Sequence, residues 1–178
     1  MGFLMDLQPS AGPALVVGGG QIAARKVRNL AEAEFEVVVV APEIRDEIRV
    51  APYVTVLGRE FRDDDLALRR FALVFACTDV RETNQRIGEL ARRAGVPVVV
   101  TDAADESTFY TPATLRQGEV AIAVSTGGAS PGVARRLREE IVKALGPRWG
   151  RITHELEESR TRREADRASR ARETEPGE

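Results

Sequence analysis

A run of four apolar residues that leads directly into glycines is the feature that most constrains this fold. Residues 14–17 precede Gly18, Gly19 and Gly20, and the small residue Ala23 follows. This order predicts a strand, a tight turn and a helix, the arrangement that sets a dinucleotide pyrophosphate on a helix N-terminus. Gly18 would permit the turn, Gly20 the approach of phosphates, and Ala23 close helix packing. A tight strand–helix turn without a ligand is the alternative.

A second strand follows at the distance that this arrangement requires. Residues 37–40 are four valines, and they end about twenty residues after the glycines, where a Rossmann domain reads the ribose. Pro42 and Glu43 come directly after them. An acidic residue near this strand tip favours NAD, because it can accept hydrogen bonds from the ribose hydroxyls.

Strand-like and helix-like segments alternate through the first 110 residues. Such repetition predicts an α/β fold of the Rossmann type, with a doubly wound parallel sheet. The predicted strands are 14–17, 37–40, 53–57, 73–76 and 96–100, and the predicted helices are 22–33 and 82–94.

The pattern changes after residue 105. An irregular segment broken at Pro112 leads to a predicted strand over 120–124 and a helix with Ser130 as N-cap. We expect apolar residues at four-residue steps to form a buried stripe on this helix: Val133, Leu137, Ile141 and Leu145.

Gly146 and Pro147 should end that helix, and the composition shifts after them. Trp149, Ile152 and Leu156 are spaced to line one face of a short helix. Beyond residue 158 the sequence is mostly charged, which predicts fraying or disorder, with a solvated helix as the alternative.

Composition narrows the class of protein. The net charge of −2 over 178 residues gives no basic footprint for nucleic acid, and no apolar run reaches the roughly 20 residues of a membrane helix. With one cysteine and one histidine, we expect no internal disulfide, no protein metal site and a reducing cytoplasm. Cys77 lies in an apolar run, so we expect a buried small hydrophobe; a Cys–His catalytic pair is the alternative.

Polar residues follow two predicted strands at the edge where open α/β sheets bind ligands. Asp102 follows the strand over 96–100 and is either a general acid or base or a turn cap. After the strand over 73–76, Thr78 is a candidate cofactor contact, and we expect Asp79 to cap the next helix.

A second glycine-rich turn opens the helix that begins at Pro131. Its free N–H groups and the helix dipole suit an anionic group with several carboxylates, whereas a simple capped helix with a solvated basic face is the alternative. The candidate substrate contacts here are Ser125, Thr126, Gly127, Gly128 and Arg135.

Together these motifs resemble the precorrin-2 dehydrogenase / sirohydrochlorin ferrochelatase family, the N-terminal module of siroheme synthases. The resemblance runs from about residue 3 to residue 147 and rests on five segments in the family's order. They are 16–26, 76–86, 100–103, 109–113 and 123–138.

The resemblance implies that precorrin-2 is oxidised to sirohydrochlorin with NAD as hydride acceptor, and that Fe2+ is a second substrate in many members. It implies that Asp102 is the catalytic aspartate and that the members are homodimers. It also implies four NAD contacts: Gln21, Ile22, Pro42 and Glu43.

The resemblance further implies an NAD-binding domain over 1–112, a dimerisation segment over 113–147 and a short charged tail over 148–178. The chain departs from the family at Val99, where many members carry Asn, and in its short tail. We expect no methyltransferase module, so another protein would supply precorrin-2. The alternatives are a bifunctional dehydrogenase–ferrochelatase and a non-catalytic NAD-binding regulatory dimer.

Overall fold

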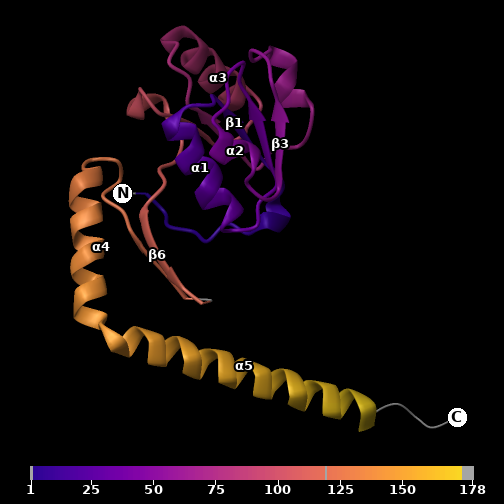
Figure 1. The fold of residues 1–178 in the computed structure, drawn as a ribbon, viewed down its shortest axis with the longest axis vertical. Helices are drawn as coiled ribbons and strands as arrows, with labels where there is room; N and C mark the ends of the chain where they lie inside the picture. The colour runs from indigo at the N-terminus through magenta and orange to yellow at the C-terminus, as the bar shows by residue number, and fades with distance from the viewer. Residues whose placement is uncertain (1, 119, 174–178) are drawn as a thin grey trace, which may run out of the picture. The chain divides into compact units, whose positions relative to one another are not determined.

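Five short parallel strands form the central sheet in the computed structural model, which describes residues 2–118 and 120–173 (Figure 1). The strand order β3-β2-β1-β4-β5 reverses direction between β1 and β4, the point at which doubly wound sheets bind ligands. The predicted Rossmann-type sheet is therefore confirmed. Its strands are β1 (Ala14–Val17), β2 (Val37–Val40), β3 (Val54–Leu57), β4 (Leu73–Ala76) and β5 (Val98–Val100).

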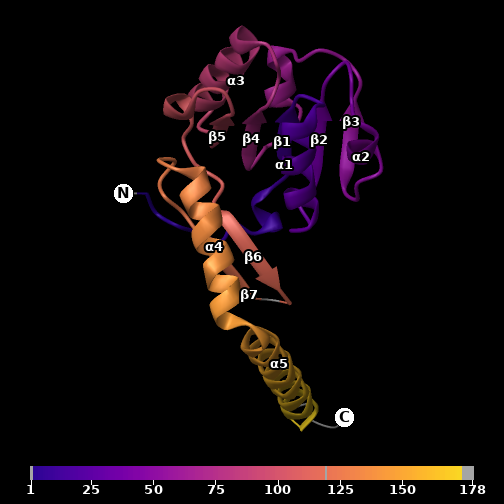
Figure 2. The same cartoon turned by 60° about the vertical axis from the view of Figure 1, so that its left-hand side comes forward.

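Helices cover both faces of this sheet, which explains why its central strands are continuously apolar. Helices α1 (Gln21–Ala31) and α2 (Asp46–Arg49) pack on one face, where α1 contributes Ala23 and Val27 and α2 contributes Ile48. Helix α3 (Arg81–Arg93) packs on the other face through Ile87 and Ala91 (Figure 2). Three short 3-10 turns complete this part of the chain: Pro9–Ala11, Asp63–Ala67 and Ala104–Glu106.

The chain divides into two compact units, Met1–Tyr110 and Thr111–Glu178. The second contains an antiparallel pair, β6 (Ala113–Gln117) and β7 (Val120–Val124), with α4 (Pro131–Leu145) packed along it (Figure 2). The sequence did not predict β6, because its five residues are mostly polar and only partly buried.

The buried stripe expected on α4 is wrong, although its N-cap is confirmed by a bond from the Val133 N–H to the Ser130 Oγ (3.4 Å). Val133 is 49% exposed and Leu137 is 48% exposed. The helix turns the face that holds buried Ala134 and half-buried Ile141 toward the two-stranded sheet. The two strands cover only this face, so Val133 and Leu137, which lie beside it, remain half exposed.

Helix α5 (Pro147–Glu173) continues well past the point where the sequence predicted fraying, and at 27 residues it is not short. Strong helix formers such as Arg, Glu and Ala, together with pairs such as Arg162–Glu158 (3.4 Å), explain a solvated helix here. The predicted apolar face is only partly correct, because Trp149 is buried and Ile152 is 54% exposed. Among the described residues no helix is long and apolar enough to cross a membrane.

Candidate functional site

Four adjacent parallel strands end at one edge of the sheet, and the residues that follow them form the candidate site. Because β1 and β4 are paired from Ala14 with Leu73 to Val17 with Ala76, Gly18 and Thr78 flank the topological switch point. The structure thus brings eight predicted residues to one edge. They are Gly18, Gly20, Gln21 and Ile22 after β1, Pro42 and Glu43 after β2, Thr78 after β4, and Asp102 after β5.

Two glycines of the turn are required by backbone packing. Gly18 has a φ of +121°, and a Cβ there would lie 2.4 Å from the carbonyl oxygen of Cys77. A Cβ on Gly19 would lie 1.9 Å from the carbonyl oxygen of Glu43. The Arg45 N–H also donates to the Gly19 carbonyl (3.2 Å). The sequence pattern assigns no role to Gly19, because only the fold brings the loop after β2 against it.

Gly20 differs from its neighbours because a Cβ there would meet no atom within 4 Å. It is the N-cap residue of α1 and offers no side-chain cap, so the N–H groups of the first helical turn have no partner inside the helix. Ile22, in that turn, is 46% exposed. An open backbone surface at a helix N-terminus fits the pyrophosphate of a dinucleotide.

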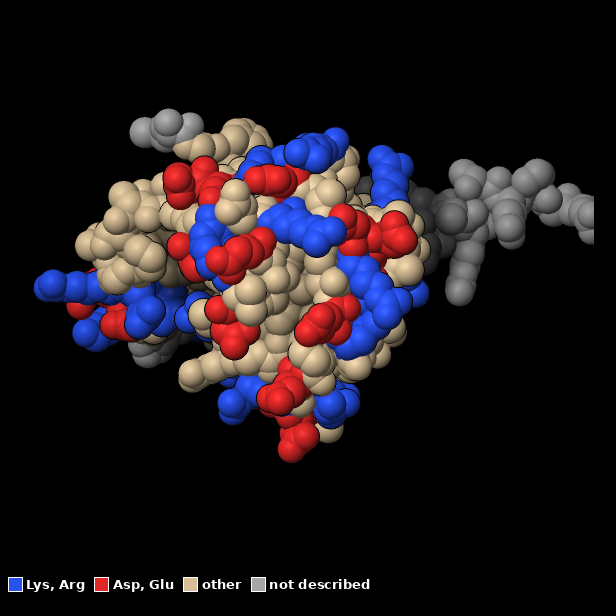
Figure 3. Space-filling model, turned by 90° about the horizontal axis from the view of Figure 1, so that it is seen from above, with Lys and Arg blue, Asp and Glu red and all other residues tan. Residues whose placement is uncertain are grey.

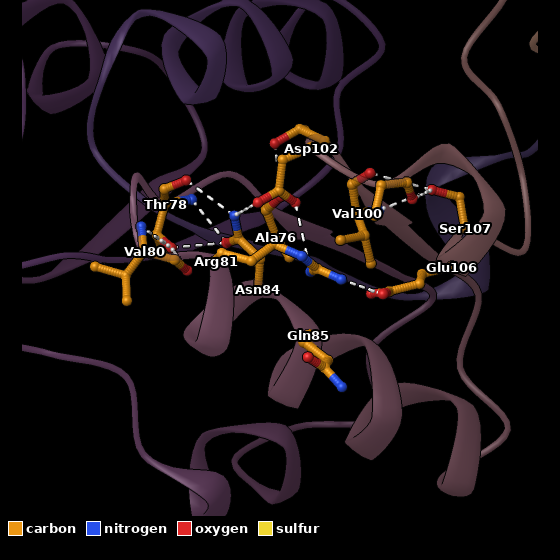
Figure 4. A network of polar contacts seen from close by, with 12 residues as sticks. Ala76, Thr78, Val80, Arg81, Asn84, Gln85, Val100, Asp102, Glu106 and Ser107 are labelled. Atoms are coloured by element: carbon orange, nitrogen blue, oxygen red, sulfur yellow. Dashed lines mark hydrogen bonds and ion pairs between the residues drawn. The ribbon is translucent and has the colours of Figure 1, made fainter.

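A buried amide links the turn after β4 to Asp102 (Figure 4). Asn84, which is fully buried, donates from Nδ2 to the Thr78 carbonyl (2.9 Å) and to Asp102 Oδ2 (3.0 Å). Its Oδ1 accepts from the Thr78 N–H (3.0 Å) and the Thr78 hydroxyl (2.7 Å). Asn84 is not among the site residues that the sequence predicts. The available signal was its place three residues before Ile87, on the inward face of α3.

Asp79 does not cap α3, which corrects the sequence prediction. The N-cap residue is Val80 and it makes no side-chain cap. Instead the Thr78 Oγ1 accepts from the Val80 N–H (3.2 Å). Thr78 organises this turn, and Asp79 stays exposed.

Arg81 lies on the other side of Asp102 (Figure 4). Its Nη1 is 3.8 Å from Asp102 Oδ1, and its Nη2 donates to Glu106. The hydrogen bond to Glu106 raises the pKa of Arg81. The side chain of Asp102 is 36% exposed. One oxygen of the carboxylate is thus hydrogen-bonded by Asn84, the other lies at ion-pair distance from Arg81, and part of the group still faces outward.

Cys77 is a buried structural residue, as the sequence predicted. Desolvation raises the pKa of its thiol to about 11, with the positive charge of Lys26 opposing that rise. Lys26 is itself buried, which lowers its pKa, and its Nζ lies 5.3 Å from the centre of the Phe75 ring. Among the described side chains no three of His, Cys, Asp or Glu are grouped so that they could hold a metal.

The predicted substrate contacts lie in the second unit, on the turn between β7 and α4. They are Ser125, Thr126, Gly127, Gly128 and Arg135. The Thr126 hydroxyl accepts from the Ser130 N–H and donates to its carbonyl (both 3.1 Å). Gly127 and Gly128 have positive φ values of +63° and +85°, and Arg135 is exposed. The turn is thus built by local hydrogen bonds around two glycines.

Basic and acidic side chains are interspersed over the face shown in Figure 3. Within the first unit such charges pair locally, as Arg59 does with Asp65 (2.5 Å) and Arg86 with Asp63 (2.6 Å). The bond from Arg59 lowers the pKa of Asp65. This face therefore carries no broad field of one sign.

The sheet order and the open glycine turn define a dinucleotide-binding Rossmann domain. A family model described as "Putative NAD(P)-binding" matches residues 5–113. The chain belongs to this NAD(P)-binding family. A second model, described as "Sirohaem biosynthesis protein central", matches residues 117–144.

Curated relatives extend the comparison. The siroheme synthase of Nitrosomonas europaea is 40% identical over 142 residues, which are 78% of this chain and 30% of that protein. The siroheme synthase of Gluconobacter oxydans is 37% identical over 165 residues, covering 89% of this chain and 34% of that protein. This chain thus spans about a third of the length of these relatives.

A solved structure has the same fold. The precorrin-2 dehydrogenase SirC superposes with a TM-score of 0.71 at 24% identity, covering 90% of this chain and 79% of that chain.

The contrast between Gly19 and Gly20 predicts two separable effects. Gly20→Ala adds a methyl group to open space, so the melting temperature should change little while the affinity for NAD+ falls about tenfold or more, because the methyl group obstructs the phosphates. Calorimetric titration with NAD+ and thermal unfolding measure the two quantities.

Gly19→Ala is the matched control. Its methyl group collides with the backbone of Glu43, so it should lower the melting temperature by several degrees. Undiminished NAD+ affinity in a folded Gly20→Ala protein would contradict the proposed phosphate site.

The raised pKa of Cys77 predicts a loss of stability at alkaline pH. The folded protein keeps the thiol protonated up to about pH 11, whereas the unfolded chain releases this proton near pH 8.5. The free energy of unfolding should therefore fall by on the order of 2 kcal/mol between these pH values. Urea titrations over this range measure that fall.

Cys77→Ala isolates the contribution of the thiol, because all other titrating groups are retained. The variant should lose less stability than the wild type over the same range. Equal losses in the two proteins would mean that the Cys77 thiol is not desolvated in solution.

Proposed function

We propose that this protein oxidises precorrin-2 to sirohydrochlorin with NAD+, a step of siroheme biosynthesis. The observation that carries the proposal is the fixed, partly exposed carboxylate of Asp102 on the strand edge that also bears the open glycine turn. The relatives named siroheme synthase and the fold shared with SirC support it. Bound NAD+ supplies the hydride acceptor. The single free cysteine suits a cytoplasmic location.

Backbone groups and Glu43 account for cofactor binding. We assign Gly18, Gly20, Gln21 and Ile22 to the pyrophosphate, where the first turn of α1 presents its N–H groups. Pro42 and Glu43 follow β2 and are assigned to the ribose. Thr78 follows β4, on the other side of the switch point, and is assigned as a further contact to NAD. The acidic side chain of Glu43 after β2 favours NAD over NADP, because it can accept hydrogen bonds from the ribose hydroxyls and would repel a 2′-phosphate.

Asp102 accounts for the proton. Conversion of precorrin-2 to sirohydrochlorin removes one hydride and one proton from the macrocycle, and we assign the proton to the Asp102 carboxylate acting as general base. The carboxylates of the substrate would be bound by Ser125, Thr126, Gly127 and Gly128 through the turn's hydrogen-bond donors and by Arg135 through its exposed guanidinium.

Asp102→Asn tests this assignment, because the amide keeps the shape of the side chain and can still accept a bond from Asn84. We expect kcat to fall about 100-fold or more, while the dissociation constant for NAD+ stays within about twofold. Anaerobic mixing with NAD+ and enzymatically generated precorrin-2, followed by absorbance of sirohydrochlorin and NADH, measures turnover.

Equal turnover in the variant would remove Asp102 from the mechanism. A wild-type protein that binds NAD+ without oxidising precorrin-2 would instead support the non-catalytic regulatory dimer. Adding Fe2+ to sirohydrochlorin in the same apparatus tests whether the protein is a bifunctional dehydrogenase–ferrochelatase, for which Fe2+ is a substrate.

We also propose that the protein is a homodimer, with an NAD-binding domain over 1–112, a dimerisation segment over 113–147 and a charged tail over 148–178. The support is the apolar side of α4 that β6 and β7 do not cover. On it Val133 and Leu137 are 49% and 48% exposed. A second copy of the chain would bury this surface.

Leu137→Glu should convert the dimer to a monomer at micromolar concentration, because it places a charge in the apolar interface. Light scattering after gel filtration measures the mass. Leu68→Glu is the control, since Leu68 is 53% exposed and lies in the other unit; this variant should keep the wild-type mass. A wild-type monomer, or a Leu137→Glu dimer, would contradict the proposed interface.

A further inference from the structure

We infer that Asn84 is a positioning residue that reserves one oxygen of Asp102 as a hydrogen-bond acceptor and leaves the other to exchange the proton. The inference rests on the proposed function. Asn84 is fully buried at the start of α3, and it contacts the turns after β4 and β5 (Figure 4).

The hydrogen bonds of Asn84 fix the orientation of its amide. Oδ1 receives two donors from Thr78, the N–H at 3.0 Å and the hydroxyl at 2.7 Å. A flipped amide would turn Nδ2 toward the Thr78 N–H, which is a donor, so the flip is unfavourable. Nδ2 must therefore face the Thr78 carbonyl and Asp102. All four hydrogen-bonding positions of the amide are then used.

This orientation makes the two oxygens of Asp102 unequal. Oδ2 accepts from Asn84 Nδ2 at 3.0 Å, and protonation of Oδ2 would weaken this charge-assisted hydrogen bond by removing the negative charge from its acceptor. Oδ1 is 3.8 Å from Arg81 Nη1, beyond hydrogen-bond distance, and Arg81 donates to Glu106 instead. The proton of the reaction therefore enters and leaves through Oδ1.

The same amide also links two strand ends. Thr78 follows β4 and Asp102 follows β5, and one planar group joins both without a flexible intermediate. The carboxylate thus keeps a constant position relative to the proposed cofactor turn. Because a displacement of about 1 Å costs about 100-fold in rate, this connection matters for turnover.

Two variants of Asn84 separate positioning from simple folding. Asn84→Asp keeps the size of the side chain and still accepts from Thr78, but it places a second carboxylate beside Asp102. Such a pair holds one shared proton at lower pH and repels when both groups ionise. Asn84→Ala removes the amide and offers no proton to share.

The expected results differ between the variants. At pH 8 to 9 both should show kcat lowered about tenfold or more relative to the wild type. The kcat of Asn84→Asp, divided by that of the wild type, should recover as the pH is lowered toward 6, because the shared proton restores a hydrogen-bond donor to Asp102 Oδ2. The same ratio of kcat values for Asn84→Ala should stay constant with pH. The other charged groups near Asp102 are Arg81 and, through it, Glu106 and Asp105, while Cys77 remains protonated throughout this range.

A further measurement does not require turnover. In a heteronuclear NMR spectrum, Asp102→Ala should shift one of the two side-chain amide protons of Asn84 and leave the other nearly unchanged, because only one faces Asp102. If the wild type fails to oxidise precorrin-2, the proposed function is wrong, and the amide spectrum still decides whether Asn84 holds Asp102.

Three outcomes would overturn the inference. The first is an Asn84→Asp protein with wild-type kcat over the whole pH range. The second is a loss of kcat that does not vary with pH and follows a lowered melting temperature equally in both variants, which indicates a folding role alone. The third is an Asn84 amide spectrum that Asp102→Ala does not change.

Discussion

Close backbone–backbone contacts at Gly18 and Gly19 set the position of the other groups at the strand edge. Position 18 carries no side chain, so the backbone of Cys77 can lie against it, and position 19 carries none, so the backbone of Glu43 can do the same. The turns after three strands are thereby held together with no flexible side chain between them. Gly20 is left facing open space. Two of three consecutive glycines therefore serve packing, and the third is the one that the proposed function assigns to the phosphates.

The turn after β5 is attached to this group by a side chain instead of by backbone contact. The Asn84 amide has a defined donor end and a defined acceptor end, so it specifies direction as well as distance. Burial makes this specification strict, because a misdirected amide would leave polar groups unsatisfied away from water. The edge thus combines a rigid part that fits phosphates with a directional part that fits proton transfer.

The sequence predicted the elements whose signal is local. The runs 14–17 and 37–40 are apolar throughout because both faces of the sheet are covered, and the structure has these strands with the predicted bounds. The sequence could not predict the contacts of Asn84, because its partners lie 6 and 18 residues away along the chain. Gly19 was missed for the same reason, because its neighbour Glu43 belongs to another turn. Spacing indicates which residues reach an edge, whereas their mutual contacts depend on how the loops fold.

The disagreement on α4 has a different cause. Apolar periodicity reflects every surface that the protein buries, including those covered by other copies or partners, while the burial in one chain reflects only its own fold. Val133 and Leu137 satisfy the period and are half exposed, so the pattern is better explained by a surface that the single chain does not supply. Full burial of such a side chain contributes about 1.5–3 kcal/mol. Because Val133 and Leu137 are only half buried, covering them with another surface would still release part of this free energy. The apolar side of α4 is thus a reason to expect an assembly, whereas the charged side chains of α5 between Glu158 and Arg163 are already solvated as they stand.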